Sequence, residues 1–325
     1  MMKNYCVGLA TFVVLWLGLT PCGFGEPLPV KTVAFSSDAV GRTMKYNIIL
    51  PAKYDQSSDR YPVLYLLHGF SSNYRAWARL GAGEAARPYD LIVVMPDVGN
   101  SWYVNWAVSE DAQKNRWEDY MIKDLIDHID ATYRTIAKRE GRAINGLSMG
   151  GYGAIMLGLK HPDLFCSIGS HSGALSFAKS AGERLRSGQP APPRKEPSTT
   201  PVPEIGIEGF TSQAERTPKG KIFEKVEDCA ACDPFQLVLQ VPREQLPHIY
   251  LDCGTEDRLI ASAQEFAKLL MEKKIPFTYA QSPGGHTGPY WTRELGLSMA
   301  VQYTILKRHL KDSAKSSVPA ATKEN

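Results

Sequence analysis

Short apolar runs alternate with stretches of helical periodicity along most of the chain after residue 46. Residues 63–67 and 91–95 are uninterrupted apolar runs, as expected of strands that are buried on both faces of a parallel sheet. Residues 117–131 repeat apolar side chains every three or four positions, which predicts an amphipathic helix. The alternation then continues, with strands expected at 142–145, 165–169, 248–252 and 277–280 and helices expected at 150–160, 260–272 and 291–310. Repeated strand–helix units predict an α/β fold, with helices on both faces of a mostly parallel central sheet.

Three segments depart from this pattern. Residues 182–209 contain six prolines and predict a loop or insertion after the strand expected at 165–169, either a lid over a site or a surface loop without function. Residues 312–325 are polar and are expected to be a disordered tail. Residues 1–25 form a third, separate segment. We therefore expect one catalytic domain at 26–311, preceded by this segment and followed by the tail.

Residues 1–25 have the organisation of a signal peptide. Lys3 is followed by the uncharged, mostly apolar residues 6–19 and then by the small residues Gly23 and Gly25. The apolar stretch is shorter than the roughly 20 residues of a spanning helix, so no stable membrane span is expected. An uncleaved anchor and a lipid anchor at Cys22 are the alternatives, although proline before that cysteine fits a lipoprotein cleavage site poorly. We expect a secreted or periplasmic protein.

Charge argues against nucleic acid as a partner. The 325 residues include 37 Lys and Arg against 34 Asp and Glu, a net charge of +3, and removal of residues 1–25 takes away one lysine and no acid. No dense basic run accompanies this small excess, whereas polyanion binding needs clustered positive charge.

The cysteines that remain after residue 25 predict a disulfide between two residues that are close in sequence. Cys229 and Cys232 are spaced as C-x-x-C, without a second such pair or a nearby histidine to complete a zinc site, so no metal is expected and a local disulfide is favoured. Cys166 and Cys253 lie in apolar runs and are expected to be buried thiols.

The most informative motif is G-x-S-x-G around Ser148. Gly146 and Gly150 flank this serine, which follows a predicted strand and precedes a predicted helix. That context is typical of a nucleophile elbow, a tight turn that exposes the serine hydroxyl. The sequence predicts Ser148 as a nucleophile.

A serine nucleophile needs a base and an orienting acid, which follow it in the chain order Ser, acid, His. Asp257 and His286 each lie in a loop after a predicted strand, at the sheet edge where open α/β folds place their sites. Asp252 and Glu256 are the rival acids. His171 is a further candidate for the pocket but precedes the acid. The remaining histidines are expected to have structural or surface positions: His68, His128, His161, His248 and His309.

Ester chemistry also requires donors to the oxyanion that forms on the substrate carbonyl. The N–H of Met149, directly after the nucleophile, and the N–H of Phe70, in the loop after an early strand, are the expected donors. Trp102 and Tyr103 follow another strand and are candidate substrate-binding residues, although aromatic anchors of a surface loop would look the same.

Six blocks in chain order resemble the putative-esterase family of α/β-hydrolases. This family includes S-formylglutathione hydrolases (esterase D), feruloyl and acetyl-xylan esterases, tributyrin esterases and mycolyltransferases. The resemblance spans about 33–310 and rests on residues 67–70, 99–104, 117–120, 146–154, 252–257 and 284–286. It implies the α/β-hydrolase fold, a catalytic triad of Ser148, Asp257 and His286 with oxyanion donors Phe70 and Met149, and no metal or organic cofactor.

The resemblance implies a serine carboxylesterase that acts on a small-molecule or carbohydrate-linked ester. An acyltransferase of the mycolyltransferase type, an S-formylglutathione hydrolase and a non-catalytic binding module on the same scaffold are the alternatives. The apparent signal peptide argues against the glutathione thioester, which belongs to the cytosol. Thr287 and Gly288 after the histidine, together with the proline-rich insertion, depart from the family pattern, so the acyl and alcohol parts of the substrate and the oligomeric state stay open.

Overall fold

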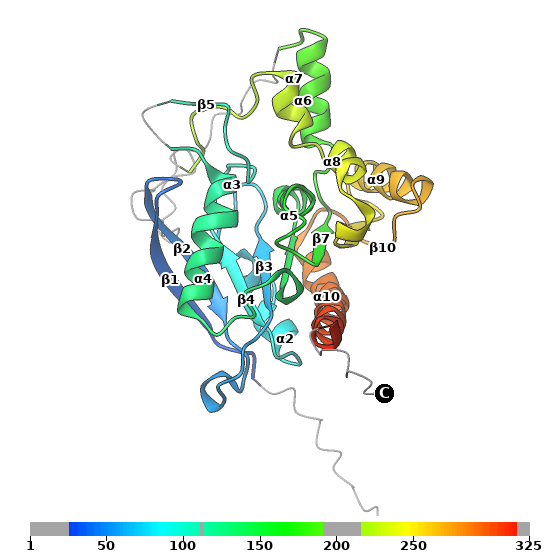
Figure 1. Cartoon of the computed structure of the whole chain (residues 1–325). Coiled ribbons are helices and arrows are strands. Elements are labelled where there is room, and N and C mark those ends of the chain that lie inside the picture. Colours follow the sequence, from blue (N-terminus) through cyan, green and yellow to red (C-terminus); the bar gives the residue numbers. More distant parts are fainter. Residues whose placement is uncertain (1–25, 111–113, 191–215, 317–325) are drawn as a thin grey trace, which may run out of the picture.

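The computed structural model describes residues 26–110, 114–190 and 216–316 (Figure 1). Within them, an eight-stranded sheet runs in the order β1-β2-β4-β3-β6-β7-β9-β10. The pairs β1–β2 and β2–β4 are antiparallel, and all pairs from β4 to β10 are parallel. The strands are β1 (Val30–Ser37), β2 (Arg42–Ile49), β3 (Val63–Leu67), β4 (Ile92–Pro96), β6 (Arg142–Gly146), β7 (Ser167–His171), β9 (His248–Gly254) and β10 (Phe277–Ser282).

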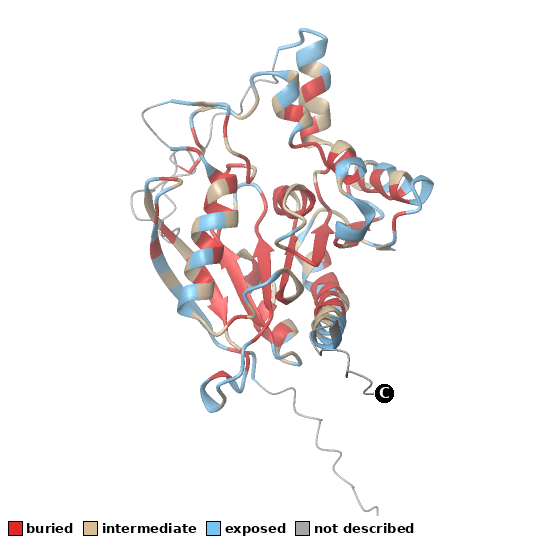
Figure 2. Ribbon diagram, in the orientation of Figure 1, coloured by how far each residue is buried: buried red, intermediate tan, exposed pale blue. Residues whose placement is uncertain are grey.

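Helices cover both faces of this sheet, as expected. One face is covered by α1 (Ala76–Arg79), α2 (Ala82–Ala86) and α10 (Gly288–Ser316). The other is covered by α3 (Trp117–Asp119), the π-helix η2 (Tyr120–Leu125), α4 (Ile126–Thr132), α5 (Met149–Lys160), α8 (Pro234–Gln240) and α9 (Ile260–Glu272). The central strands are buried along their whole length between these layers, which explains why their sequences are uninterrupted apolar runs (Figure 2).

Smaller elements lie outside the main layers. Helices α6 (Phe177–Arg186) and α7 (Val226–Ala230) pack against each other and project beyond one end of the sheet (Figure 1). A two-stranded sheet joins β5 (Val108–Ser109) to β8 (Gly220–Lys221). Three single-turn helices complete the described elements: η1 (Tyr54–Gln56), η3 (Arg139–Gly141) and η4 (Arg243–Gln245).

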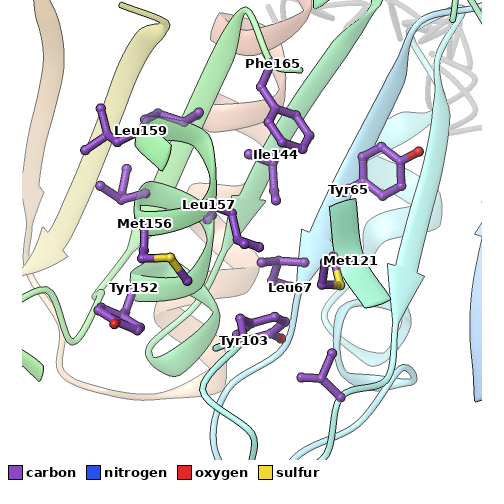
Figure 3. Close-up of a cluster of buried hydrophobic side chains, with 14 of the residues drawn as sticks. Tyr65, Leu67, Tyr103, Met121, Ile144, Tyr152, Met156, Leu157, Leu159 and Phe165 are labelled. Carbon is purple, nitrogen blue, oxygen red and sulfur yellow. The ribbon is translucent and has the colours of Figure 1, made fainter. Parts of the chain in front are cut away.

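Helix α5 is the most deeply buried helix of the site region. Every residue from Met149 to Leu159 is buried. Its side chains Tyr152, Met156 and Leu157 pack in one cluster with residues of β3 and β6, including Leu67 and Ile144 (Figure 3). Because close-packed interiors resist displacement, α5 is a firm support for the turn at its N-terminus.

Several expected boundaries differ from the observed ones. The strand expected at 165–169 is β7, shifted by two residues, and the helix expected at 117–131 contains the π-helical turns of η2. Helix α6 includes residues 182–186 of the expected insertion, and α10 continues through residues 312–316 of the expected tail. Both segments are polar enough to suggest a loop, but each helix buries a few apolar or small side chains against its neighbours. Residues 1–25, 191–209 and 317–325 lie outside the described residues.

The expected disulfide is wrong, because Cys229 and Cys232 are both free thiols. The chain makes a helical turn between them, in which the N–H of Cys232 donates to the carbonyl of Cys229 at 3.0 Å. Cys229 packs against Gly182 of α6, whereas the Cys232 carbonyl accepts a hydrogen bond from Tyr152 of α5. Cys229 thus contacts α6, whereas the backbone of Cys232 contacts α5. Cys166 and Cys253 are buried free thiols, as predicted.

No helix in the described part of the chain is both long enough and apolar enough to cross a membrane.

Candidate active site

The turn between β6 and α5 holds Ser148 in an unusual backbone conformation. Its φ of 54° and ψ of −115° lie outside the regions that side-chain-bearing residues prefer. Its N–H donates to the carbonyl of His171 at 2.9 Å, and the N–H of Leu147 donates to the carbonyl of Leu67 at 3.1 Å. Neighbouring strands therefore hold the strained turn in place, as at many functional sites.

The two glycines of the motif are required by close packing. A Cβ atom on Gly146 would lie 2.3 Å from the carbonyl oxygen of Gly150, and one on Gly150 would lie 2.3 Å from that of Leu67. Both distances are far below van der Waals contact. The G-x-S-x-G spacing thus reflects the approach of β3, β6 and α5 to one another.

Ser148, His286 and Asp257 form one hydrogen-bonded chain. His286 Nε2 lies 2.9 Å from Ser148 Oγ, and His286 Nδ1 lies 2.9 Å from Asp257 Oδ2 and 3.2 Å from Asp257 Oδ1. The Asp257 side chain is fully buried, and its Oδ1 also accepts the N–H of Leu259 at 2.8 Å. These contacts fix the carboxylate and, through it, the imidazole. The sequence places all three residues at the carboxyl edge of the sheet, and the structure brings them together.

The rival candidates are placed elsewhere. Asp252 is buried beside His171, with Oδ2 only 2.6 Å from His171 Nδ1, although this contact lacks hydrogen-bond alignment. Asp252 Oδ1 also accepts the Tyr290 hydroxyl at 3.1 Å. Glu256 is exposed. Asp252 and His171 therefore pair with each other below the turn, and neither side chain reaches the Ser148 hydroxyl.

The two expected oxyanion donors flank Ser148. A Cβ on Gly69 would lie 3.4 Å from Ser148 Cβ, so the backbone leading into Phe70 passes directly beside the serine. Met149 occupies the first position of α5, where N–H groups have no partner within the helix. Neither the N–H of Phe70 nor that of Met149 donates to another described residue. Both are thus available to a bound oxygen.

The loop that carries Phe70 is held by a buried charge network. Arg216 and Asp97 are both buried, and Arg216 Nη2 lies 2.7 Å from Asp97 Oδ1 and donates to the carbonyl of Ser72 at 2.7 Å. Asp97 Oδ1 also accepts the N–H of Gly99 at 2.9 Å. Burial alone would raise the pKa of Asp97, but the Arg216 guanidinium, the His68 ring and the N–H of Gly99 outweigh it and lower that pKa.

Tyr103 does not line the pocket, contrary to expectation. Its side chain is fully buried, and its hydroxyl donates to the carbonyl of His68 at 2.8 Å. It therefore supports the loop beside Ser148 from below. Trp102 is half-buried; its ring stacks on Phe177 of α6 with centroids 3.5 Å apart and lies 6.1 Å from the ring of Phe70.

A pocket of about 410 Å³ opens onto Ser148 and His286. The His286 ring contacts Trp291 edge-on at 4.9 Å, which gives the pocket one aromatic wall. Among the described residues, the pocket is lined by Gly69, Phe70, Ser72, Ala76, Arg79, Leu80, Leu147, Ser148, Arg258, His286 and Trp291. The pocket is thus mostly apolar, with the serine hydroxyl and the imidazole at its base.

Four charged residues of this region escaped the sequence reasoning, and one of them is Arg79 of the pocket lining. Asp97 directly follows the strand β4, and this position at a strand end was an available signal. Arg216 lies 119 residues away from Asp97 in sequence, so no local pattern connects the two. Arg258 directly follows Asp257, but a single arginine in a loop carries no recognisable signal. In the described residues, no group of histidine, cysteine and acidic side chains is arranged to hold a metal ion.

Comparison with known proteins identifies a family for this chain. Residues 37–298 match the family described as "Putative esterase". Esterase Rv1288 of Mycobacterium tuberculosis is 30% identical over 78% of this chain but only 54% of its own length, so the chain spans about half of that relative. An acetyl esterase of Caldicellulosiruptor saccharolyticus is 26% identical over 74% of this chain and 82% of the relative.

A solved structure has the same fold. FphF, a fluorophosphonate-binding serine hydrolase of Staphylococcus aureus, superposes with a TM-score of 0.65 at 23% identity, covering 86% of this chain and 99% of FphF. At this identity the similarity concerns the fold. Together with the family match over most of the chain, it leads to one conclusion: the protein belongs to the putative-esterase family and has the α/β-hydrolase fold.

Proposed function

We propose that this protein is a serine carboxylesterase that hydrolyses acyl esters through an acyl-enzyme. The observation that carries the proposal is the hydrogen-bonded chain from Ser148 through His286 to the buried Asp257, at the base of an open pocket. Membership of an esterase family supports ester bonds as the target. A binding module on the same scaffold would need neither the aligned imidazole nor the strained serine.

Acylation begins at the Ser148 hydroxyl. Its Oγ attacks the ester carbonyl carbon while its proton passes to His286 Nε2, 2.9 Å away. Asp257 holds Nδ1 as the protonated nitrogen and stabilises the imidazolium that forms. The oxyanion receives hydrogen bonds from the N–H groups of Phe70 and Met149. The tetrahedral intermediate then expels the alcohol, which takes the proton from His286 Nε2.

Deacylation repeats these steps with water. His286 Nε2 removes a proton from a water molecule, and the resulting hydroxide attacks the carbonyl of the acyl-enzyme. Collapse of the second tetrahedral intermediate returns the proton to Ser148 Oγ and releases the carboxylic acid. The enzyme is regenerated without net change.

The test is turnover of p-nitrophenyl esters of increasing acyl length, with feruloyl esters and S-formylglutathione included. Ser148→Ala should lower kcat by about 10⁴-fold or more, because the nucleophile is lost while the pocket remains. The chain-length profile of the wild type then identifies the acyl group. Equal hydrolysis by wild type and Ser148→Ala would refute the proposed mechanism.

A second arm tests the orienting acid. Asp257→Asn should lower kcat by roughly 10³- to 10⁴-fold, since an amide no longer fixes the productive imidazole tautomer. Asp252→Asn is the matched control, because Asp252 pairs with His171 instead. A larger catalytic loss in Asp252→Asn than in Asp257→Asn, with both variants folded by circular dichroism, would move the acid role to Asp252.

We also propose that residues 1–25 direct export and are removed, which would place the enzyme outside the cytoplasm. The support is the order of Lys3, an apolar run and small residues. N-terminal sequencing of the exported protein should begin near residue 26. An exported or cytoplasmic protein that keeps Lys3 would contradict this.

A further inference from the structure

The charged side chains that line the pocket beside Ser148 and His286 are both arginines. Arg258 enters from the loop after β9, directly following Asp257, and Arg79 enters from the end of α1. Both are exposed. Among the described residues, no Asp or Glu lines this pocket, and the Asp257 carboxylate that pairs with His286 is fully buried. The described lining of the approach to the serine therefore includes two guanidinium groups and no carboxylate.

Of the two arginines, Arg258 is the stronger candidate for binding an anion. Within the described residues, no carboxylate lies within ion-pair distance of its guanidinium. The neighbouring lining is apolar or aromatic, with Phe70, Leu80 and Trp291 around the opening. A charge beside such low-dielectric walls interacts more strongly with an anion than it would on an open surface.

We propose that this pocket selects esters that carry a carboxylate group, which Arg258 binds while the ester carbonyl lies at Ser148. A guanidinium matches a carboxylate with two parallel hydrogen bonds, so it both attracts and orients the substrate. The inference rests on the proposed esterase function. It adds the chemical class of the substrate, which neither the family match nor the named relatives supply for this chain.

The experiment compares two pairs of esters that differ by one negative charge. On the acyl side, mono-4-nitrophenyl adipate is compared with its methyl ester; its chain is long enough to limit attack by its own carboxylate. On the alcohol side, 4-acetoxybenzoate is compared with methyl 4-acetoxybenzoate. Each kcat/KM is divided by the rate of hydroxide hydrolysis of the same ester. The charged-to-neutral ratio is the readout, because it is insensitive to general losses of activity.

The wild type should prefer the charged ester by about two- to fivefold in at least one pair, a size typical of exposed ion pairs. The preference should fall as salt rises, since ions screen exposed charges. It should approach one in Arg258→Gln and should persist in Arg258→Lys, which keeps the charge. The pair that shows the preference identifies whether the carboxylate belongs to the acyl or the alcohol part.

A matched control separates local binding from net charge. Lys31→Gln removes one positive charge from the exposed edge strand β1, away from the pocket lining, and should keep the wild-type ratio. A wild-type ratio of one or less in both pairs, or an unchanged ratio in Arg258→Gln, would overturn the inference. If Ser148→Ala still abolishes turnover of the neutral esters in that case, the esterase proposal stands while the substrate class fails.

Discussion

Single glycines determine whether the turn at Ser148 can form. The carbonyl oxygen of Leu67 occupies the space that a side chain on Gly150 would need, and this oxygen is backbone that is hydrogen-bonded to Leu147. The strained serine therefore depends on its neighbours having no Cβ. The glycines on either side of the serine thus control whether its hydroxyl is presented at all.

Gly150→Ala should lower the free energy of unfolding by at least about 3 kcal/mol, at the upper end of overpacking effects, because the clash is with backbone. Gly296→Ala is the matched control: Gly296 lies within α10, and a Cβ there meets no atom within 4 Å. The control should stabilise the protein by about 0.5–1 kcal/mol, the usual gain of alanine over glycine in a helix. Urea denaturation measures both, and equal effects would contradict the packing argument.

Local sequence patterns were sufficient to predict the residues that we propose to be catalytic. They were not sufficient to predict the residues that support them. Ser148 stands in a recognisable motif, and Asp257 and His286 follow it at the ends of predicted strands. Tyr103 and Arg216 are different, because their roles follow from burial beneath the loop of Phe70, which depends on distant parts of the chain. The sequence around Tyr103 looks the same whether its ring faces a substrate or the core.

At the scale of elements, the loop after β3 is joined to two other segments through Arg216. This arginine contacts Asp97 after β4 and Ser72 after Phe70, and its carbonyl accepts the N–H of Asn100 at 3.1 Å. Three loops at the carboxyl edge of the sheet are thus held by one buried side chain. The position of the proposed oxyanion donor at Phe70 depends on all three.

Arg216→Gln should lower the free energy of unfolding by about 3–5 kcal/mol, because it leaves the buried Asp97 carboxylate without its charged partner. Lys221→Gln is the control in the same segment; Lys221 pairs with Glu224 at the surface, and an exposed pair contributes under about 1 kcal/mol. Thermal or urea unfolding compares the two variants. Similar small losses in both would show that the Arg216–Asp97 pair does not stabilise the loops.

The helices and strands that the sequence predicted correctly are those with a strong hydrophobic pattern. Residues 63–67 and 260–272 match β3 and α9 without change. The strand β1 was missed because it is an edge strand with mostly exposed side chains, and β2 was missed except for its apolar end. The short helices α1, α2 and α7 were missed as well, since helices of this length are formed by tertiary packing and not by a periodic pattern.

At the scale of the whole molecule, helix α10 covers one face of the sheet. One histidine beside this helix, His248, links the stability of the folded protein to pH. His248 begins β9, and its Nε2 lies 3.1 Å from Thr278 Oγ1. Burial, together with the charges of Arg308 and His309 on α10, lowers the pKa of His248 from 6.5 to about 4. The folded protein therefore holds this imidazole neutral where the unfolded chain would protonate it.

For a histidine with a lowered pKa, the unfolded state binds the proton first as the pH falls. Its contribution to stability is complete above about pH 6.5 and is lost progressively towards pH 4, by up to about 2 kcal/mol at pH 5. His248→Gln should therefore lose less unfolding free energy between pH 7 and pH 5 than the wild type does. Urea denaturation at the two pH values measures this, and an identical pH dependence in both proteins would contradict the assignment.

The central claim is that Ser148 carries the acyl group during turnover. The most direct measurement is mass spectrometry of the protein after reaction with a fluorophosphonate, which forms a stable adduct on activated serine nucleophiles. The proposed mechanism predicts one adduct per chain, located on the peptide that contains Ser148, with loss of esterase activity in proportion to labelling and no adduct in Ser148→Ala. An adduct on a different serine, or full ester hydrolysis by the Ser148-labelled protein, would contradict it.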